Sequence, residues 1–125
     1  MRTKYHNRKI TREGLTFDSL KEYRRFCELR LLEKAGEIQS LERQKPFELI
    51  PAQYEYYERY GKNGKRLKDG KRCVEKSVVY NADFVYTKDG KIVVEDTKSA
   101  ITKTKDYVLK RKMLLYFHGI HIREV

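Results

Sequence analysis

The chain has few of the residues that hold small secreted or metal-clamped domains together. Among its 125 residues only Cys27 and Cys73 are cysteines, too few and too isolated for a disulfide framework or a cysteine metal motif. The three histidines, His6, His118 and His121, lack the spacing of zinc ligands. We therefore expect two reduced thiols and no zinc site.

Long hydrophobic runs are missing as well. No stretch approaches the roughly 20 apolar residues of a spanning helix, and no strongly basic amphipathic helix stands out. The N-terminal sequence MRTKYHNRKITRE has no apolar core of the kind that a secretory signal needs. We expect a cytoplasmic protein without membrane contact, folded as one domain over residues 1–125.

Acidic residues are outnumbered, with 18 Asp and Glu against 29 Lys and Arg, for a net charge of +11. Such an excess favours a polyanionic partner, because neutralised phosphates release condensed counterions. Nucleic acid is the first candidate. The expected phosphate contacts are a basic N-terminal arm (1–14), a basic hairpin tip (61–72) and the second helix region: Lys62, Lys65, Arg66, Lys68, Lys71, Arg72, Lys103, Lys105, Lys110 and Arg111.

Two segments have helical periodicity followed by a glycine stop. The first runs from Asp18 or Ser19 to Ala35 and ends at Gly36. The second runs over residues 105–117 and ends at Gly119, with Thr102 or Thr104 as its cap and Tyr107, Leu114 and Leu115 among its inward positions.

The only two prolines, Pro46 and Pro51, bracket an apolar segment that predicts a strand over residues 47–50 at a sheet edge. Further strands are expected over residues 74–86 and 91–98 and at the terminal IHIREV. A strand, helix and strand in succession normally form a right-handed parallel crossover, so the last strand should lie parallel to strand 91–98. The fold class is α/β, with a mixed sheet flanked by helices.

The pair Asp89-Gly90 lies between two alternating apolar runs, which is a strong signal for a two-residue type I′ hairpin loop. In that register Lys88 pairs with Lys91, and Asp83 lies opposite Asp96. Side chains alternate between faces, so Asp83, Asp96 and Lys98 share one face while Glu95 points to the other.

Two adjacent carboxylates repel each other unless a cation or a proton separates them. Mg²⁺ takes oxygen ligands, which here would be Asp83, Asp96 and the Thr97 carbonyl. Lys98 would then orient the attacking water at a scissile phosphate. The structural alternative is an ion pair between Lys98 and Asp96 at a sheet edge, with Asp83 closing a bend. A different loop length would also shift the register and separate the two carboxylates.

Glu22 falls inside the apolar arc of the first helix, between Phe26 and Leu29 on a helical wheel. An acid on that side is consistent with a role at the carboxylate site. Ser19 and Glu22 also fit a capping box, in which Glu22 would only satisfy backbone donors. Both interpretations stay open from the sequence.

These residues resemble the motif of the PD-(D/E)XK nuclease superfamily, in which an Asp on the second core strand precedes (D/E)-x-K on the third. Asp83 of NADF and the DTK at 96–98 match it, with Ala82 in place of the motif proline. More narrowly, FDSLKEYRRFCELRLLEKAGEI, LERQKPFEL, NADFVY, VVEDTKS and IREV resemble a small phage family of unassigned function placed in that superfamily. The resemblance runs from about Leu15 to Val125.

The resemblance implies a restriction-endonuclease-like α-β-β-β-α-β core and Mg²⁺-dependent cleavage of DNA, with Mn²⁺ as a substitute. It implies that Glu22 is a metal-binding acid of the first helix and that Gln44 lies near the site, while Glu95 is a substitute ligand if the register slips. The expected protein is a phage endonuclease of recombination or branched DNA, similar to Holliday-junction resolvases, and a homodimer is the assembly to test. The alternative is a non-catalytic nucleic-acid-binding protein.

Overall fold

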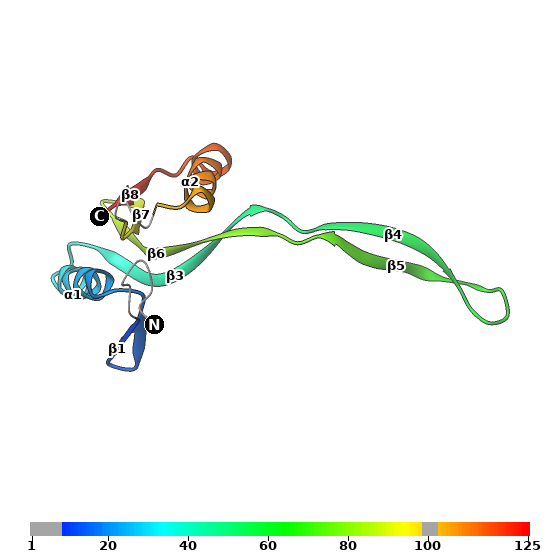
Figure 1. Ribbon diagram of the computed structural model, residues 1–125, viewed down its shortest axis with the longest axis horizontal. Helices are drawn as coiled ribbons and strands as arrows, with labels where there is room; N and C mark the ends of the chain where they lie inside the picture. The colour runs from blue at the N-terminus through cyan, green and yellow to red at the C-terminus, as the bar shows by residue number, and fades with distance from the viewer. Residues whose placement is uncertain (1–8, 99–102) are drawn as a thin grey trace, which may run out of the picture.

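A mixed four-stranded sheet forms the centre of the protein in the computed structural model, which describes residues 9–98 and 103–125 (Figure 1). Its strand order is β3-β6-β7-β8, and a helix packs on each face. Two further hairpins, β1–β2 and β4–β5, lie outside this sheet. The elements are β1 (Ile10–Arg12), β2 (Leu15–Phe17), α1 (Leu20–Lys34), β3 (Gln39–Ile50), β4 (Gln53–Tyr60), β5 (Arg66–Glu75), β6 (Val78–Lys88), β7 (Lys91–Asp96), α2 (Lys105–His118) and β8 (Ile122–Glu124).

The strand directions make the sheet mixed: β6 is antiparallel to both β3 and β7, and β8 is parallel to β7. The prediction of a parallel last strand is therefore confirmed. β3 is an edge strand, as Pro46 requires because it has no N–H for a second neighbour. It is much longer than the predicted segment 47–50.

Both helices begin and end at the residues that the sequence indicates. The Ser19 hydroxyl caps α1 by accepting a hydrogen bond from the Glu22 N–H, and Thr104 caps α2 in the same way. Gly36 and Gly119 follow the helices with φ of 78° and 68°, which a residue with a Cβ rarely adopts. The prediction for Leu115 was wrong: it is 41% exposed, because it lies about 100° around α2 from the buried Leu114.

The β6–β7 hairpin has the predicted register, with Lys88 opposite Lys91 and Phe84 opposite Glu95. Asp89 and Gly90 both have positive φ, 51° and 75°, as a type I′ turn requires. Phe84–Glu95 is the last pair of the ladder, so the regular pairing stops one position short of Asp83 and Asp96.

Strands β3 and β6 change their buried face at the same place. Tyr80 lies in the apolar cluster of α2, and Phe84 lies in that of α1, although regular alternation would put both on one face. Gln44 on β3 has φ of 51°, a conformation that costs about 1 kcal/mol for a residue with a Cβ. The change of face occurs at Gln44 and Asp83, and it lets one pair of strands pack against both helices.

The β4–β5 hairpin forms a long two-stranded ribbon that extends away from the sheet and helices (Figure 1). The basic segment predicted as a tip is only partly a tip, since residues from Arg66 onward belong to β5. Val74 also belongs to β5 and not to the strand that carries Asp83. The β4–β5 ladder runs to the pair Tyr60–Arg66, so the hairpin tip consists of residues 61–65.

Part of the predicted N-terminal arm forms a small hairpin, in which β1 pairs with β2. Residues 1–8 of that arm lie outside the described residues. Within the described chain, neither helix is long and apolar enough to cross a membrane.

Candidate metal and nucleic-acid site

Two buried carboxylates lie where β6 and β7 part. Asp83 is 8% exposed, and its Oδ2 accepts hydrogen bonds from the Thr97 N–H at 3.0 Å and the Thr97 hydroxyl at 2.8 Å. Its Oδ1 accepts a hydrogen bond from Gln44 Nε2 at 3.2 Å. Thr97 thus bonds to the side chain of Asp83 where the regular ladder has ended, which fixes the direction of that carboxylate.

Asp96 is 2% exposed, and its two carboxylate oxygens have different surroundings. The Tyr80 hydroxyl donates to its Oδ2 at 2.5 Å. No hydrogen bond from the described residues reaches Oδ1, and Lys98 Nζ lies 3.5 Å from that atom. Lys98 is itself positioned over the ring of Tyr107, 4.5 Å from the centroid.

The two carboxyls influence each other's protonation. Burial and then the adjacent Asp83 raise the pKa of Asp96 to about 8. Burial would also raise the pKa of Asp83, but the neighbouring Asp96 carboxyl, the hydrogen bonds from Thr97 and the charge of Lys98 lower it below its usual value. Near neutral pH the metal-free pair therefore holds one proton, as two carboxyls at a shared site do.

Glu22 joins this pair through Gln44. Gln44 Nε2 donates to both Glu22 Oε1 and Asp83 Oδ1, each at 3.2 Å. The other oxygen of Glu22 accepts a hydrogen bond from the Asp18 N–H at 2.9 Å, so the same side chain serves the helix N-terminus and the site. Burial and then the charge of Asp83 raise the pKa of Glu22. Its role as a metal ligand stays a prediction.

Glu95 lies on the opposite face of β7, as predicted. Arg25 of α1 donates to both of its carboxylate oxygens at 2.7 Å, and the Tyr86 hydroxyl donates to one of them. Burial would raise the pKa of Glu95, but these hydrogen bonds and the charge of Arg25 lower it. Glu95 is thus fully neutralised away from the Asp83–Asp96 pair.

The predicted phosphate contacts fall into two separate groups. The first six, from Lys62 to Arg72, are exposed along the β4–β5 ribbon. The second group lies at α2, where Lys103 and Arg111 contact Glu124 at 3.6 and 3.4 Å. This second group also contains Lys105, the first residue of α2, and Lys110, which pairs with Asp106 at 3.4 Å.

Sequence reasoning missed several partners of the site. The sequence indicates Tyr80 only weakly as a partner of the site: it lies on the strand of Asp83, two residues before Ala82. Nothing in the sequence indicates Arg43. In the structure its Nη2 lies 3.8 Å from Glu22 Oε1, and its Cζ lies 4.0 Å from the centroid of the Phe17 ring. Arg25 likewise looks like an ordinary surface residue of a charged helix.

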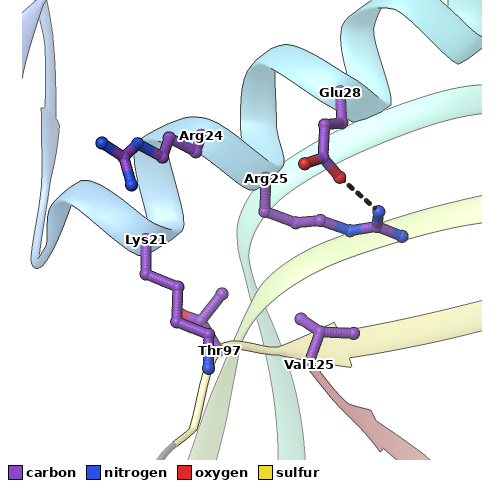
Figure 2. Close-up of a pocket in the computed structure, with 6 residues that line it drawn as sticks. All are labelled: Lys21, Arg24, Arg25, Glu28, Thr97 and Val125. Atoms are coloured by element: carbon purple, nitrogen blue, oxygen red, sulfur yellow. Dashed lines mark hydrogen bonds and ion pairs between the residues drawn. The ribbon is translucent and has the colours of Figure 1, made fainter.

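A basic pocket of about 340 Å³ adjoins the site on the α1 side (Figure 2). Lys21 reaches across it and donates to the backbone carbonyl of Lys98 at 3.1 Å. Thr97, which holds Asp83, also forms part of its wall. The lining residues are Lys21, Arg24, Arg25, Glu28, Thr97 and Val125.

The donor set fits a hard divalent cation with few protein ligands. Asp96 Oδ1 is buried without a hydrogen-bond partner in the described structure, and a second carboxylate lies beside it. Mg²⁺ is often held by one or two carboxylates, with water and substrate phosphate as its remaining ligands. Across residues 9–98 and 103–125 no group of three or more His, Cys, Asp and Glu side chains is placed to hold a metal ion.

These observations define a mixed α/β domain with a buried carboxylate pair, an adjacent lysine and a basic surface. The chain belongs to the family described as protein of unknown function DUF1064, whose model matches residues 2–123. No curated protein and no solved structure matches the chain.

Proposed function

We propose that this protein is a Mg²⁺-dependent DNA endonuclease of the PD-(D/E)XK type. The observation that carries the proposal is the arrangement of Asp83, Asp96 and Lys98 where the β6–β7 ladder opens. Two buried carboxylates and one ammonium group meet there, and one carboxylate oxygen has no hydrogen-bond partner among the described residues. The net charge of +11 supports a polyanionic substrate.

The order of the core elements also supports the superfamily. Without the two outer hairpins, the chain runs α1, β3, β6, β7, α2, β8, which is the α-β-β-β-α-β order expected from the resemblance. The β4–β5 ribbon is then an insertion between the first and second core strands. Asp83 lies on the second core strand, and Asp96 ends the third.

The protein side chains have distinct tasks in this proposal. Asp83 and Asp96 hold the cation, with the Thr97 carbonyl as a further predicted ligand, and Glu22 reaches the site through Gln44. Thr97 and Tyr80 fix the two carboxylates from opposite sides. A bound Mg²⁺ would supply Lewis-acid stabilisation of the charge that develops on the phosphate.

Lys98 acts on the water and the phosphate. Its ammonium group lies 3.5 Å from Asp96 Oδ1 and 4.5 Å from the centroid of the Tyr107 ring. In hydrolysis water attacks phosphorus, one P–O ester bond breaks, and the leaving oxygen takes a proton from solvent. A positioned ammonium group orients the water and offsets the added negative charge.

The test is a cleavage assay with linear duplex, single-stranded, nicked, flapped and four-way-junction DNA, each with Mg²⁺, Mn²⁺ or EDTA. Wild type is compared with Asp83→Asn and Lys98→Gln. Metal-dependent cutting that both variants lose supports the nuclease, and the best substrate shows whether branched DNA of recombination is the target. Binding without cutting under every metal would overturn it in favour of a non-catalytic DNA-binding protein. Light scattering with and without DNA tests the predicted homodimer.

A further inference from the structure

The β4–β5 ribbon has no core of its own. Every residue of β4 is exposed, and Gly70 is the only buried residue of β5. In Figure 1 the ribbon extends far from both helices and from the central sheet. An isolated two-stranded ribbon is marginally stable in water, so we expect a partner that binds the ribbon and stabilises it.

The register separates the ribbon into two faces. Tyr54, Tyr56 and Tyr60 alternate along β4 and share a face with Lys71 and Arg66 of β5, their cross-strand partners or neighbours. Lys71 Nζ lies 3.9 Å from the centroid of the Tyr54 ring, which confirms that these side chains are on the same side. We call these five residues the tyrosine face. Its tyrosines are 45%, 66% and 58% exposed.

The opposite face is largely satisfied within the ribbon. The ring of Tyr57 lies directly over Gly70, where a Cβ would come within 2.2 Å of it, so this glycine is required by close packing. Arg72 pairs with Glu55 at 2.8 Å. An aromatic ring over a strand glycine stiffens the ribbon.

On the tyrosine face Arg66 pairs with Asp69 at 2.8 Å, and the Tyr60 hydroxyl donates to Glu58 at 2.7 Å. Tyr54, Tyr56 and Lys71 remain on this face as exposed groups that can contact a partner.

Charge decides the class of partner. Residues 53–75 contain seven Lys and Arg against four acids, and six of the seven basic residues lie between Lys62 and Arg72, where Asp69 is the one acid. A second copy of this ribbon would repel it, whereas a polyanion would release counterions on binding. Among polyanions, the major groove of duplex DNA is wide enough for a two-stranded β-ribbon.

We propose that the β4–β5 ribbon is an arm that binds in the major groove of duplex DNA, with the tyrosine face toward the base edges and Lys62, Lys65 and Lys68 on the phosphates. This inference rests on the proposed function in one respect, that DNA is the substrate. Residues 66–83 connect the arm to Asp83 and span up to about 55 Å at ~3.3 Å per residue. At about 3.4 Å per base pair, the arm calls for roughly 16 base pairs of duplex beside the cleavage point.

The test measures DNA binding by intact protein in EDTA, so that it is independent of cleavage. Two matched variants each remove two positive charges from the ribbon: Arg66→Gln/Lys71→Gln on the tyrosine face and Arg59→Gln/Arg72→Gln on the opposite face. Fluorescence anisotropy with a 30-base-pair duplex should show about tenfold or greater loss of affinity for the first variant and less than about threefold for the second. Wild type should protect guanine N7 from methylation, and the first variant should not.

Each other result overturns the arm. Equal losses in the two variants would mean that the ribbon contributes only a general positive field. Protection of adenine N3 alone would place it in the minor groove, and equal affinity for single-stranded DNA of the same length would indicate base stacking instead. A dimer that sediments faster than the monomer and depends on the ribbon would show that the ribbon binds a second copy of the chain. If wild type cuts DNA while these outcomes occur, only the arm fails; if wild type binds no DNA, the proposed function fails as well.

Discussion

The two neighbouring acids at the end of β7, Glu95 and Asp96, have opposite surroundings. Glu95 faces α1, where Arg25 and Tyr86 donate hydrogen bonds to its oxygens. Asp96 faces the other side, where Tyr80 satisfies one oxygen and a second acid lies beside the other. Lys98 Nζ lies 3.5 Å from that second oxygen and balances one of the two acids, so this side of β7 is incompletely neutralised. A fully paired buried acid supports the fold, whereas two buried acids side by side store an unfavourable interaction that a further cation can relieve.

The largest expected effect is on the incompletely neutralised side. Asp83→Asn or Asp96→Asn should lower the rate of metal-dependent DNA cleavage by about 10³-fold or more, because each removes a charged oxygen from the cation site. Single-turnover cleavage measures it, and circular dichroism checks the fold. Glu37→Gln is the control: this exposed acid between α1 and β3 should leave the rate within about twofold. Equal activity in all three variants would remove the site from the proposal.

On the neutralised side the expected loss is of stability. Arg25→Met should lower the free energy of unfolding by about 3–5 kcal/mol, because it leaves Glu95 buried and charged without its partner. Urea denaturation gives the value. Arg24→Met, at the exposed neighbouring position, should change it by less than about 0.5 kcal/mol. The double variant Arg25→Met/Glu95→Met should recover most of the loss, and failure to recover would show that Arg25 acts mainly through packing.

A smaller effect is expected for the lysine beside the pair. Lys98→Gln should lower the cleavage rate by about 10²-fold while DNA affinity falls less than about threefold, since the ammonium group acts on the reacting water and phosphate. Lys91→Gln, at the start of β7 and away from the carboxylate pair, is the matched control and should leave the rate unchanged. A loss of affinity that accounts for the whole loss of rate would reduce Lys98 to a binding residue.

The smallest effect sharpens the contrast between the two acids. In EDTA, Asp96→Asn should raise the free energy of unfolding by about 1 kcal/mol, because an amide beside Asp83 can donate a hydrogen bond where two carboxyls compete. Glu95→Gln should lower it by about 2 kcal/mol, since a charged partner of Arg25 is lost. Thermal unfolding without metal measures both. The same sign for both variants would mean that the two acids have equivalent surroundings.

Local rules predicted a large part of this structure. Ser19 and Thr104 cap the helices, and Gly36 and Gly119 end them, because each property depends on a few neighbouring residues. Asp89-Gly90 set the hairpin register and so placed Asp83 near Asp96 and turned Glu95 away. The buried position of Glu22 followed from helical spacing alone.

Other features depend on contacts that local pattern does not contain. The ribbon was interpreted as a short tip because glycines and lysines look like a loop until a partner strand is known. Leu115 fits the apolar arc of α2 but is 41% exposed. Helical spacing does not show which side of that arc meets the sheet. The change of face at Gln44 breaks the alternation on which the strand predictions relied.

The sequence by itself determined which side chains lie near one another along a helix, a turn or a hairpin, since those distances follow from fixed backbone periods. Only the tertiary structure decided which acid is neutralised. Arg25 reaches Glu95 across 70 positions of sequence, and Gln44 connects Glu22 to Asp83 across 22 and 39. The electrostatic difference between Glu95 and Asp96 arises because packing brings Arg25 to both oxygens of Glu95, whereas Asp96 lies beside Asp83 with Lys98 3.5 Å from one oxygen.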